Sequence, residues 1–420
     1  MDKLRIRGGN PLRGHIPISG AKNASLPMLA AALLTSEPVR LSNVPRLRDV
    51  HTMLAVLQAL GAEATFCGAS DVAVCAQDIH TLKAPYDLVK TMRASFLVLG
   101  PLLARFQHVE VSLPGGCAIG TRPIDQHLKA LEALGASIEL NEGYVTANID
   151  GRLQGAVIDL DIATVTGTQN ALMAATLADG ESTIVNAARE PEIQALADML
   201  IAMGADIDGA GTDVISIKGC ETLHGCTRHL MPDRIEAGTF LIAGAATQGS
   251  VHIDGGCHEW LEAPLAKLRQ AGADITLDDD MIHLDMHGRR PKATDIRTAT
   301  YPGVPTDLQA QFLALNCVAE GTSRVIETIF ENRFMHVPEL ARLGADIESD
   351  GTTATVRGVK QLHGANIMAT DLRASSCLVI GGLAARGETI VDRVYHLDRG
   401  YERIEAKLTA VGADIQRFNA

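Results

Sequence analysis

Aromatic residues are scarce in this sequence, and its charge balance excludes several kinds of partner. Only 3% of the 420 residues are Phe, Trp or Tyr, and the formal net charge is −13. Such a chain has few rings on which single-stranded bases could stack and no general attraction for nucleic acid or an anionic membrane. Apolar residues make up 46% and charged residues 21%, which is typical of a soluble globular protein. An anionic ligand must therefore be met by locally placed cations.

Long hydrophobic runs and paired cysteines are also absent. The opening MDKLRIRGGN has no apolar stretch of the signal-peptide kind, and LPMLAAALL is far shorter than the ~20 residues that span a bilayer. We therefore expect a cytoplasmic protein with no membrane partner. The eight cysteines contain no C-x-x-C and are scattered irregularly, which indicates reduced thiols. Cys220, His224, Cys226 and His229 match no standard zinc spacing, so an ordinary surface turn is preferred there and no metal is expected.

Several common catalytic motifs do not occur. The chain has no G-x-x-x-x-G-K-[ST], no G-x-S-x-G and no H-E-x-x-H, and GAGTDV at 209–214 lacks the last glycine of a dinucleotide fingerprint. ATP hydrolysis, serine-triad chemistry and zinc hydrolysis all lose support, and no cofactor is expected.

A short phrase recurs through the whole sequence. Its copies read LGAEATF, LGASIEL, MGADIDG, AGADITL, LGADIES and VGADIQR. Their glycines are spaced 68 to 74 residues apart, at Gly61, Gly135, Gly204, Gly272, Gly344 and Gly412. A repeat at a fixed period indicates one structural unit used six times.

Every copy has the same internal order of elements. An apolar segment such as NASLPMLAAALL or ASFLVLGPLLA predicts a buried helix, and an amphipathic helix stopped by glycine precedes each phrase. Short alternating runs such as DVAVCA and DVISIKG predict strands. The unit is therefore strand, helix, strand, helix, strand, strand.

The six units are expected to form two lobes, because one unit is too small to bury its own sheet and helices. Residues 21–231 hold the first three copies, and residues 232–420 hold the last three. The opening segment LRIRGGNPLRGHIPISG should supply strands that the sixth copy lacks, so residues 1–20 join the second lobe. The fold class is α/β, in two lobes with three repeats each.

Cations recur where the chain enters the helices of these units. The residues entering the first helix of a unit are Lys22 and Asn23, Arg93, Asp233, Asp307, and Asp371 with Arg373; those entering the second are Arg48, Arg122, Arg189 with Glu190, Arg333 and Arg399. A helix start normally favours acidic groups. Arginines at these places make sense if they share an anion such as phosphate or carboxylate, and the alternative for any single one is a surface ion pair.

One cysteine stands apart from the other seven, which read as small hydrophobic residues. Cys117 lies in VSLPGGCAIGTRPIDQ, with glycines at 115, 116 and 120 and with Arg122 five residues away. The glycines suit a loop that closes over a ligand, and a nearby cation favours the thiolate or proton exchange. The sequence therefore predicts an acid or a nucleophile on a lid.

Nine phrases that span the chain closely resemble the UDP-N-acetylglucosamine 1-carboxyvinyltransferase family of enolpyruvyl transferases. They are GAKNASLP, PYDLVKTMRAS, SLPGGCAIGTRPID, NAAREPEI, MPDRIEAGTF, PTDLQAQF, FENRFMHVPEL, ATDLRASS and DRGYERI. The resemblance implies an inside-out α/β barrel in two lobes of three repeats each. It also implies transfer of the enolpyruvyl group of phosphoenolpyruvate to the 3′-hydroxyl of UDP-N-acetylglucosamine with release of phosphate, the first committed step of peptidoglycan synthesis, without a metal or cofactor.

The resemblance also implies a role for individual residues. Cys117 would donate a proton to carbon, Asp307 would take or orient the proton of the sugar hydroxyl, and the cations of Lys22, Arg122, Arg373 and Arg399 would hold the phosphate and carboxylate. Contacts to the nucleotide sugar would come from Asn23, Arg93, Pro123, Ile124, Asp125, Gln126, Thr164, Val165 and Ile329. Glu190, Asp233, Arg333 and Asp371 would support this network. The chain departs from the family pattern at Arg48 and at Ile162–Val165, where some members have lysine.

Two alternatives remain at this point. A shikimate-pathway enolpyruvyl transferase would share the fold and donor but would lack the lid cysteine and the GAKNA phrase. A non-catalytic paralogue that only binds UDP-N-acetylglucosamine would be expected to have lost Cys117 or Asp307, and both are present. The sequence does not set the oligomeric state, and a monomer is assumed.

Overall fold

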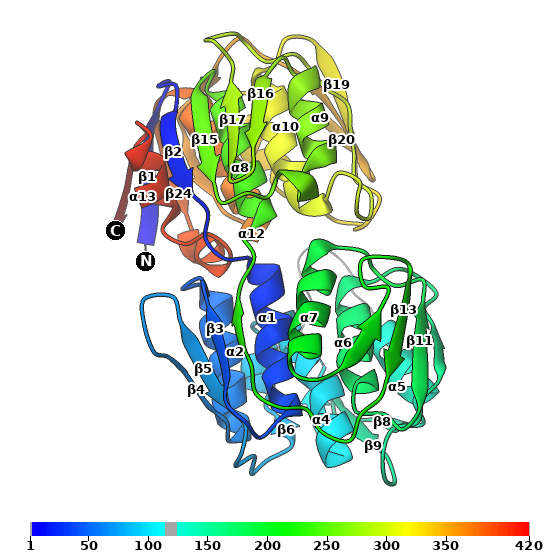
Figure 1. Ribbon diagram of the computed structural model, residues 1–420. Coiled ribbons are helices and arrows are strands. Elements are labelled where there is room, and N and C mark those ends of the chain that lie inside the picture. Colours follow the sequence, from blue (N-terminus) through cyan, green and yellow to red (C-terminus); the bar gives the residue numbers. More distant parts are fainter. Residues whose placement is uncertain (1, 114–123, 420) are drawn as a thin grey trace. The chain divides into compact units, whose positions relative to one another are not determined.

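The computed structural model describes residues 2–113 and 124–419, which fall into two compact units (Figure 1). The described residues within Gly20–Gly116 and Arg122–Met231 form one unit, here called the first lobe. Those within Met1–Ser19 and Pro232–Ala420 form the other, the second lobe. Among the described residues, the hydrophobic core of each lobe is made of side chains from that lobe.

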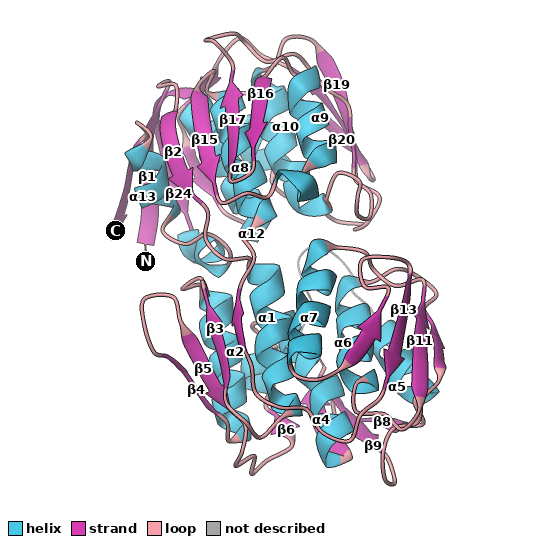
Figure 2. Ribbon diagram, in the orientation of Figure 1, coloured by secondary structure: helices cyan, strands magenta, loops and turns pink. Residues whose placement is uncertain are grey.

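Each lobe contains three sheets among its described residues, one for each copy of the repeat (Figure 2). In the first lobe the strand orders are β14-β3-β5-β4, β6-β7-β9-β8 and β10-β11-β13-β12; in the second they are β2-β15-β17-β16, β18-β19-β21-β20 and β22-β24-β1-β25, with β23 also paired to β24. All six sheets follow one rule, in which a parallel pair is followed by two antiparallel pairs. This regularity confirms the six-unit fold.

The elements of the first lobe have the following bounds. The strands are β3 (Val39–Ser42), β4 (Glu63–Phe66), β5 (Val72–Cys75), β6 (Lys83–Ala84), β7 (His108–Ser112), β8 (Ser137–Asn141), β9 (Tyr144–Asn148), β10 (Val157–Asp159), β11 (Glu181–Val185), β12 (Asp206–Asp208), β13 (Val214–Lys218) and β14 (Thr227–His229). The helices are α1 (Lys22–Ala31), η1 (Ala32–Leu34), α2 (Arg48–Leu60), α3 (Tyr86–Val89), η2 (Arg93–Val98), α4 (Leu99–Phe106), α5 (Asp125–Ala133), α6 (Val165–Ala175) and α7 (Pro191–Ala202), where η marks a 3₁₀ helix.

The second lobe is built in the same way. Its strands are β1 (Asp2–Gly8), β2 (Arg13–Pro17), β15 (Ser250–Asp254), β16 (Asp274–Asp278), β17 (Met281–Asp285), β18 (Ile296–Arg297), β19 (Thr322–Ile326), β20 (Asp346–Asp350), β21 (Thr353–Arg357), β22 (Leu362–His363), β23 (Asn366–Met368), β24 (Ala385–Asp392) and β25 (Asp414–Asn419). Its helices are α8 (Arg234–Ala246), η3 (His258–Trp260), α9 (Glu262–Gln270), η4 (Thr306–Leu308), α10 (Gln309–Val318), α11 (Val337–Arg342), α12 (Leu372–Ala384), η5 (Val394–Arg399) and α13 (Ile404–Ala410).

The more apolar helix of each unit lies inside its lobe, as predicted. Every residue of α8 and α10 is buried, and so is nearly all of α12. A helix that is buried all round must be packed on every side. In each lobe the sheets lie outside these helices, with alternating strands such as β19 turning one face to the core (Figure 2). The arrangement is inside-out relative to a barrel whose strands line the centre.

The six recurring glycines have one structural function. Gly61, Gly135, Gly204, Gly272, Gly344 and Gly412 all have positive φ, between 91° and 112°. Each follows the second helix of its unit and turns the chain into the next strand. A side chain disfavours this left-handed conformation, so glycine is required where the helix ends.

Three sheets are completed by strands from elsewhere in the sequence. β1 pairs with β24 and β25, so the opening segment completes the sixth sheet, as predicted. β2 instead pairs in parallel with β15 of the fourth copy, which corrects the assignment of the whole opening segment to the sixth. The segment interpreted as a surface turn near Cys226 contains β14, which pairs with β3 of the first copy. Local patterns could not reveal these pairings, because the partners are far apart in the sequence.

Among residues 2–113 and 124–419, no helix has the length and apolar character needed to cross a bilayer.

Candidate active site

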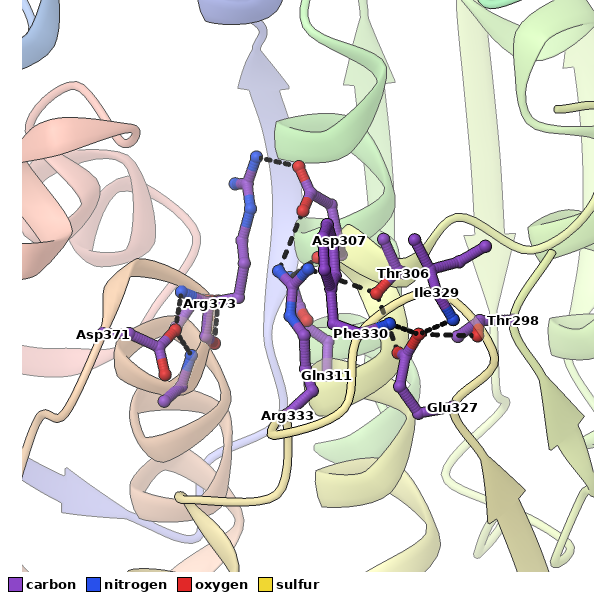
Figure 3. Close-up of polar contacts among 12 residues, drawn as sticks. Thr298, Thr306, Asp307, Gln311, Glu327, Ile329, Phe330, Arg333, Asp371 and Arg373 are labelled. Atoms are coloured by element: carbon purple, nitrogen blue, oxygen red, sulfur yellow. Dashed lines mark hydrogen bonds and ion pairs between the residues drawn. The ribbon is translucent and has the colours of Figure 1, made fainter. Parts of the chain in front are cut away.

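Asp307 lies between two buried arginines in the second lobe (Figure 3). Nη2 of Arg333 is 2.9 Å from one carboxylate oxygen of Asp307, and Nη2 of Arg373 is 2.7 Å from the other. Both arginine side chains are only 5% exposed, whereas that of Asp307 is 26% exposed. Asp307 belongs to η4, Arg333 follows β19, and Arg373 belongs to α12. Three candidate residues from two repeat copies thus form one ion-paired cluster.

Arg373 is held as a cation by its surroundings. Burial alone would lower its pKa, but the charge of Asp307, the phenol of Tyr401 and the charge of Asp233 outweigh burial and raise it. The phenol oxygen of Tyr401 accepts a hydrogen bond from Nη1 of Arg373 at 3.3 Å. It also lies 2.9 Å from Oγ1 of Thr239 and 3.1 Å from Oγ of Ser376. The guanidinium is therefore fixed in position as well as in charge.

Two candidate acids of the second lobe cap the start of a helix with their side chains. Oδ1 of Asp233 accepts hydrogen bonds from the amides of Ile235 and Glu236 at the start of α8. Oδ1 of Asp371 accepts from the amides of Arg373 and Ala374 at the start of α12. An Asp at this position satisfies amides that have no partner within the helix. Helix capping thus explains why aspartate occurs at both positions, with no ligand needed. At Asp371 the capping bonds also fix the backbone from which Arg373 projects.

The remaining candidates of the second lobe differ in exposure. Ile329 is 38% exposed, in the loop between β19 and Arg333. Arg399 is half-buried and ends η5, five residues before α13 begins. Arg333 likewise stands in the connection before α11. These two cations lie in the connections that enter the second helix of their units, where the sequence pattern placed them.

Sequence reasoning missed two polar residues of this region, Glu327 and Thr306. Glu327 is 1% exposed and accepts hydrogen bonds from the side chains of Thr298 and Thr306 and from the amides of Ile329 and Phe330 (Figure 3). A glutamate directly after the alternating strand β19, close in sequence to the FENR phrase, was the signal available.

In the first lobe, Lys22 is the first residue of α1 and pairs with an acid from the neighbouring helix. Its Nζ lies 3.4 Å from Oδ2 of Asp49, in the first turn of α2. The two side chains are 13% and 4% exposed. Arg48 precedes Asp49 and is exposed, and Asn23 follows Lys22 and is half-buried. The beginnings of α1 and α2 thus present their charges at one end of the helix pair.

A second group of first-lobe candidates surrounds the start of α5. Asp125 is its first residue, and burial lowers the pKa of His127 to about 3, with the charge of Arg93 acting in the same direction and that of Asp125 opposing it. The buried side chain of Gln126 accepts from the amide of Asp161 at 2.8 Å and donates to its carboxylate at 3.0 Å.

These bonds of Gln126 anchor the segment that leads to α6. That segment contains the candidate Thr164, which is the N-cap of α6, and ends at Val165, the first residue of the helix. Ile162 on this segment is 56% exposed. Ile124 is the N-cap of α5, and Glu190 is the N-cap of α7. The side chain of Gln126 is therefore occupied by the protein itself, which leaves its backbone for the contact that the resemblance implies.

Three predicted residues, Cys117, Arg122 and Pro123, lie outside the residues that the structure describes. Over the described ranges there is no group of three or more His, Cys, Asp or Glu side chains arranged to hold a metal ion.

Comparison with known proteins identifies a family. The model of the family described as EPSP synthase (3-phosphoshikimate 1-carboxyvinyltransferase) matches residues 6–408. The chain is 57% identical over 420 residues to UDP-N-acetylglucosamine 1-carboxyvinyltransferase of Shewanella pealeana, and 58% identical over 419 residues to that of Shewanella woodyi, with 100% of each chain covered.

Solved structures agree with this assignment. The enolpyruvyl transferase NikO from Streptomyces tendae is 29% identical with a TM-score of 0.88, over 100% of this chain and 99% of that one. EPSP synthase from Acinetobacter baumannii, at 19% identity and a TM-score of 0.75 over 100% of both chains, shares the fold. The chain therefore belongs to the EPSP synthase family of enolpyruvyl transferases, and within it to the UDP-N-acetylglucosamine 1-carboxyvinyltransferases.

Proposed function

We propose that this transferase moves the enolpyruvyl group of phosphoenolpyruvate to the 3′-hydroxyl of UDP-N-acetylglucosamine and releases phosphate. The observation that carries the proposal is identity of 57–58% over the full length to relatives named for this reaction. We place the reaction at the first committed step of peptidoglycan synthesis, in the cytoplasm. Its substrates are the two small molecules, and it requires no cofactor.

The chemistry is an addition followed by an elimination. A proton adds to the methylene carbon of phosphoenolpyruvate, C2 becomes electrophilic, and the sugar oxygen forms a bond to C2 as its own proton leaves. The tetrahedral ketal then loses a methyl proton and phosphate, which restores the double bond. Cys117 supplies the first proton. Fixed cations hold the carboxylate and stabilise the negative charge that builds on the phosphate as it leaves the ketal.

The geometry around Asp307 supports a specific role for this residue. Each of its oxygens already accepts a hydrogen bond from a guanidinium group, Arg333 on one side and Arg373 on the other. A carboxylate held in this way has a fixed direction. Asp307 therefore orients the attacking hydroxyl. Arg373, held as a cation, remains available to the donor's carboxylate.

The other proposed roles follow the family resemblance. Lys22, Arg122 and Arg399 hold the phosphate, and Arg399 shares the carboxylate with Arg373. Asn23, Arg93, Asp125, Ile329 and the backbone of residues 122–126 contact the nucleotide sugar, with Thr164 and Val165 beside them. Glu190, Asp233, Arg333 and Asp371 hold these groups in place.

A coupled phosphate-release assay tests the reaction. Purified protein with phosphoenolpyruvate should release phosphate only when UDP-N-acetylglucosamine is present. Shikimate 3-phosphate is the control acceptor, because the family model carries the name of the enzyme that uses it. Release with shikimate 3-phosphate alone would assign the shikimate reaction, and binding of UDP-N-acetylglucosamine without release would assign a non-catalytic paralogue.

The lid thiol has its own test. Cys117→Ala should abolish turnover and leave the affinity for UDP-N-acetylglucosamine within about tenfold, or roughly 1.4 kcal/mol. Fosfomycin, an epoxide that resembles the donor, should alkylate Cys117. Label found on one of the other seven cysteines by peptide mapping would contradict the assignment.

A further inference from the structure

We propose that Glu327 and Thr306 are positioning residues that hold Arg333, Asp307 and Ile329 for the nucleotide sugar. This inference rests on the proposed function, because that function gives these three residues their substrate. Glu327 and Thr306 do not touch the reacting atoms in this proposal. They act through the neighbours that they hold.

The carboxylate of Glu327 collects four hydrogen bonds inside the second lobe (Figure 3). Its Oε1 accepts from Oγ1 of Thr298 at 3.0 Å, from the amide of Ile329 at 2.7 Å and from the amide of Phe330 at 3.2 Å. Its Oε2 accepts from Oγ1 of Thr306 at 2.7 Å. All four partners are donors, which is the pattern that suits an ionised carboxylate with no proton of its own.

The hydroxyl of Thr306 links this carboxylate to the arginine. It donates to Glu327 and accepts from Nη1 of Arg333 at 3.1 Å. The same guanidinium donates from Nη2 to Asp307, which is the next residue after Thr306. A hydroxyl has a single proton, so the bond to Glu327 leaves its lone pairs directed to Arg333. The orientation of Arg333 is therefore set by two adjacent residues of η4.

The hydrogen bonds of Glu327 and Thr306 connect groups from separate stretches of sequence. Glu327 holds the backbone that presents Ile329 to solvent, and through Thr306 it holds the turn that carries Asp307. The side chain of Arg333 is only 5% exposed, so its position depends on these partners more than on water. A displacement of about 1 Å at an orienting group can slow a reaction by ~100-fold. Buried contacts remote from the chemistry can thus control it.

Thr306→Val removes the hydroxyl and keeps the shape of the side chain. We expect kcat/KM for UDP-N-acetylglucosamine to fall by about tenfold or more, with a higher KM for that substrate and a KM for phosphoenolpyruvate within twofold of wild type. Thr306→Ser should restore most of the loss. Thr294→Val is the matched control, because Thr294 is a buried threonine of the same lobe whose hydroxyl donates to the carbonyl of Lys292.

Glu327→Gln tests the other end of the link. The amide oxygen can still accept from the amides of Ile329 and Phe330, but its NH₂ group then faces the Thr306 hydroxyl that must donate. We expect the same pattern of KM and kcat as in Thr306→Val, and the double variant should be no worse than either single one. The control is Asp295→Asn, in which an acid that accepts from the amide of Arg324 undergoes the same exchange.

Amide hydrogen exchange separates this inference from the proposed function, because it requires no substrate. In Glu327→Ala the amides of Ile329 and Phe330 lose their acceptor and should exchange at least tenfold faster than in wild type or Asp295→Asn. Unchanged exchange in a peptide covering residues 327–333, or Thr306→Val and Glu327→Gln kinetics equal to wild type, would overturn the inference. A wild-type protein without transferase activity would refute only the proposed function, since exchange would still decide whether Glu327 fastens this loop.

Discussion

Replacing Asp307 by Asn removes the carboxylate charge that lies between the guanidinium groups of Arg333 and Arg373. The shape of the side chain stays, and one oxygen can still accept from one arginine. The NH₂ group then faces the other arginine, donor against donor. Both arginine side chains are 5% exposed, so water can replace little of the lost interaction.

The magnitude follows from this burial. Removing one partner of a buried ion pair costs ~3–5 kcal/mol because a charge is left uncompensated. Asp307 is 26% exposed, which places the loss near the lower end, so we expect Asp307→Asn to lower the free energy of unfolding of the second lobe by about 3 kcal/mol. The exposed pair Arg357 and Asp346, 3.2 Å apart, is the control, since Asp346→Asn should cost at most ~1 kcal/mol.

The assay is unfolding in urea, monitored by the hydrogen exchange of peptides from α12. These peptides report on the second lobe alone. A second variant tests the cause. Adding Arg333→Met to Asp307→Asn removes one of the two uncompensated charges, so the double variant should regain at least 1 kcal/mol, or about fivefold in the unfolding equilibrium. A loss in Asp307→Asn no greater than that in Asp346→Asn, or a double variant less stable than Asp307→Asn, would refute the reasoning.

Three further changes test the scaffold. Nε and Nη2 of Arg290 donate to the carbonyls of Val318, Ala319 and Val359 at 2.7–2.8 Å, so Arg290→Ala should cost about 2 kcal/mol in urea unfolding, whereas Arg297→Ala on an exposed face should cost little. Burial lowers the pKa of His127 to about 3, so the contribution of His127 to stability is complete above about pH 6.5 and is lost as the pH falls toward 3. His127→Gln should therefore reduce the pH dependence of the free energy of unfolding between pH 7.5 and 5. His80→Gln, at an exposed site, should leave that pH dependence unchanged. Gly272 has φ +98°, and no atom lies within 4 Å of the position that a Cβ would take. Gly272→Ala should therefore lower the melting temperature through backbone strain of about 1 kcal/mol, and Gly272→Asn should lower it by less. Equal melting temperatures for Gly272→Ala and wild type would contradict this account.

Much of the site could be predicted from the sequence, but the structural reasons for some of its residues could not. Asp307, Arg333 and Arg373 were singled out by their recurring positions in the repeat, and they meet in the second lobe. Asp233 and Asp371 were interpreted as members of a ligand network, and their helix-capping bonds became visible only with the backbone in place. Glu327 offered only its place close to the FENR phrase, and Tyr401 was not singled out, because a buried carboxylate or phenol is recognised by the polar groups that surround it after folding.

The sequence by itself determined the six units, their internal order and the places where each second helix ends. These features depend on spacing within a few residues, on apolar periodicity and on glycines, which adopt a positive φ at the least cost. Only the tertiary structure decided that β14 joins β3 and that β2 joins β15. The residues of a strand of three to five residues do not specify its partner strand, because the pairing depends on which sheet edge is left unpaired in the folded lobe. The same holds for Glu327, whose function arises from neighbours that only folding assembles.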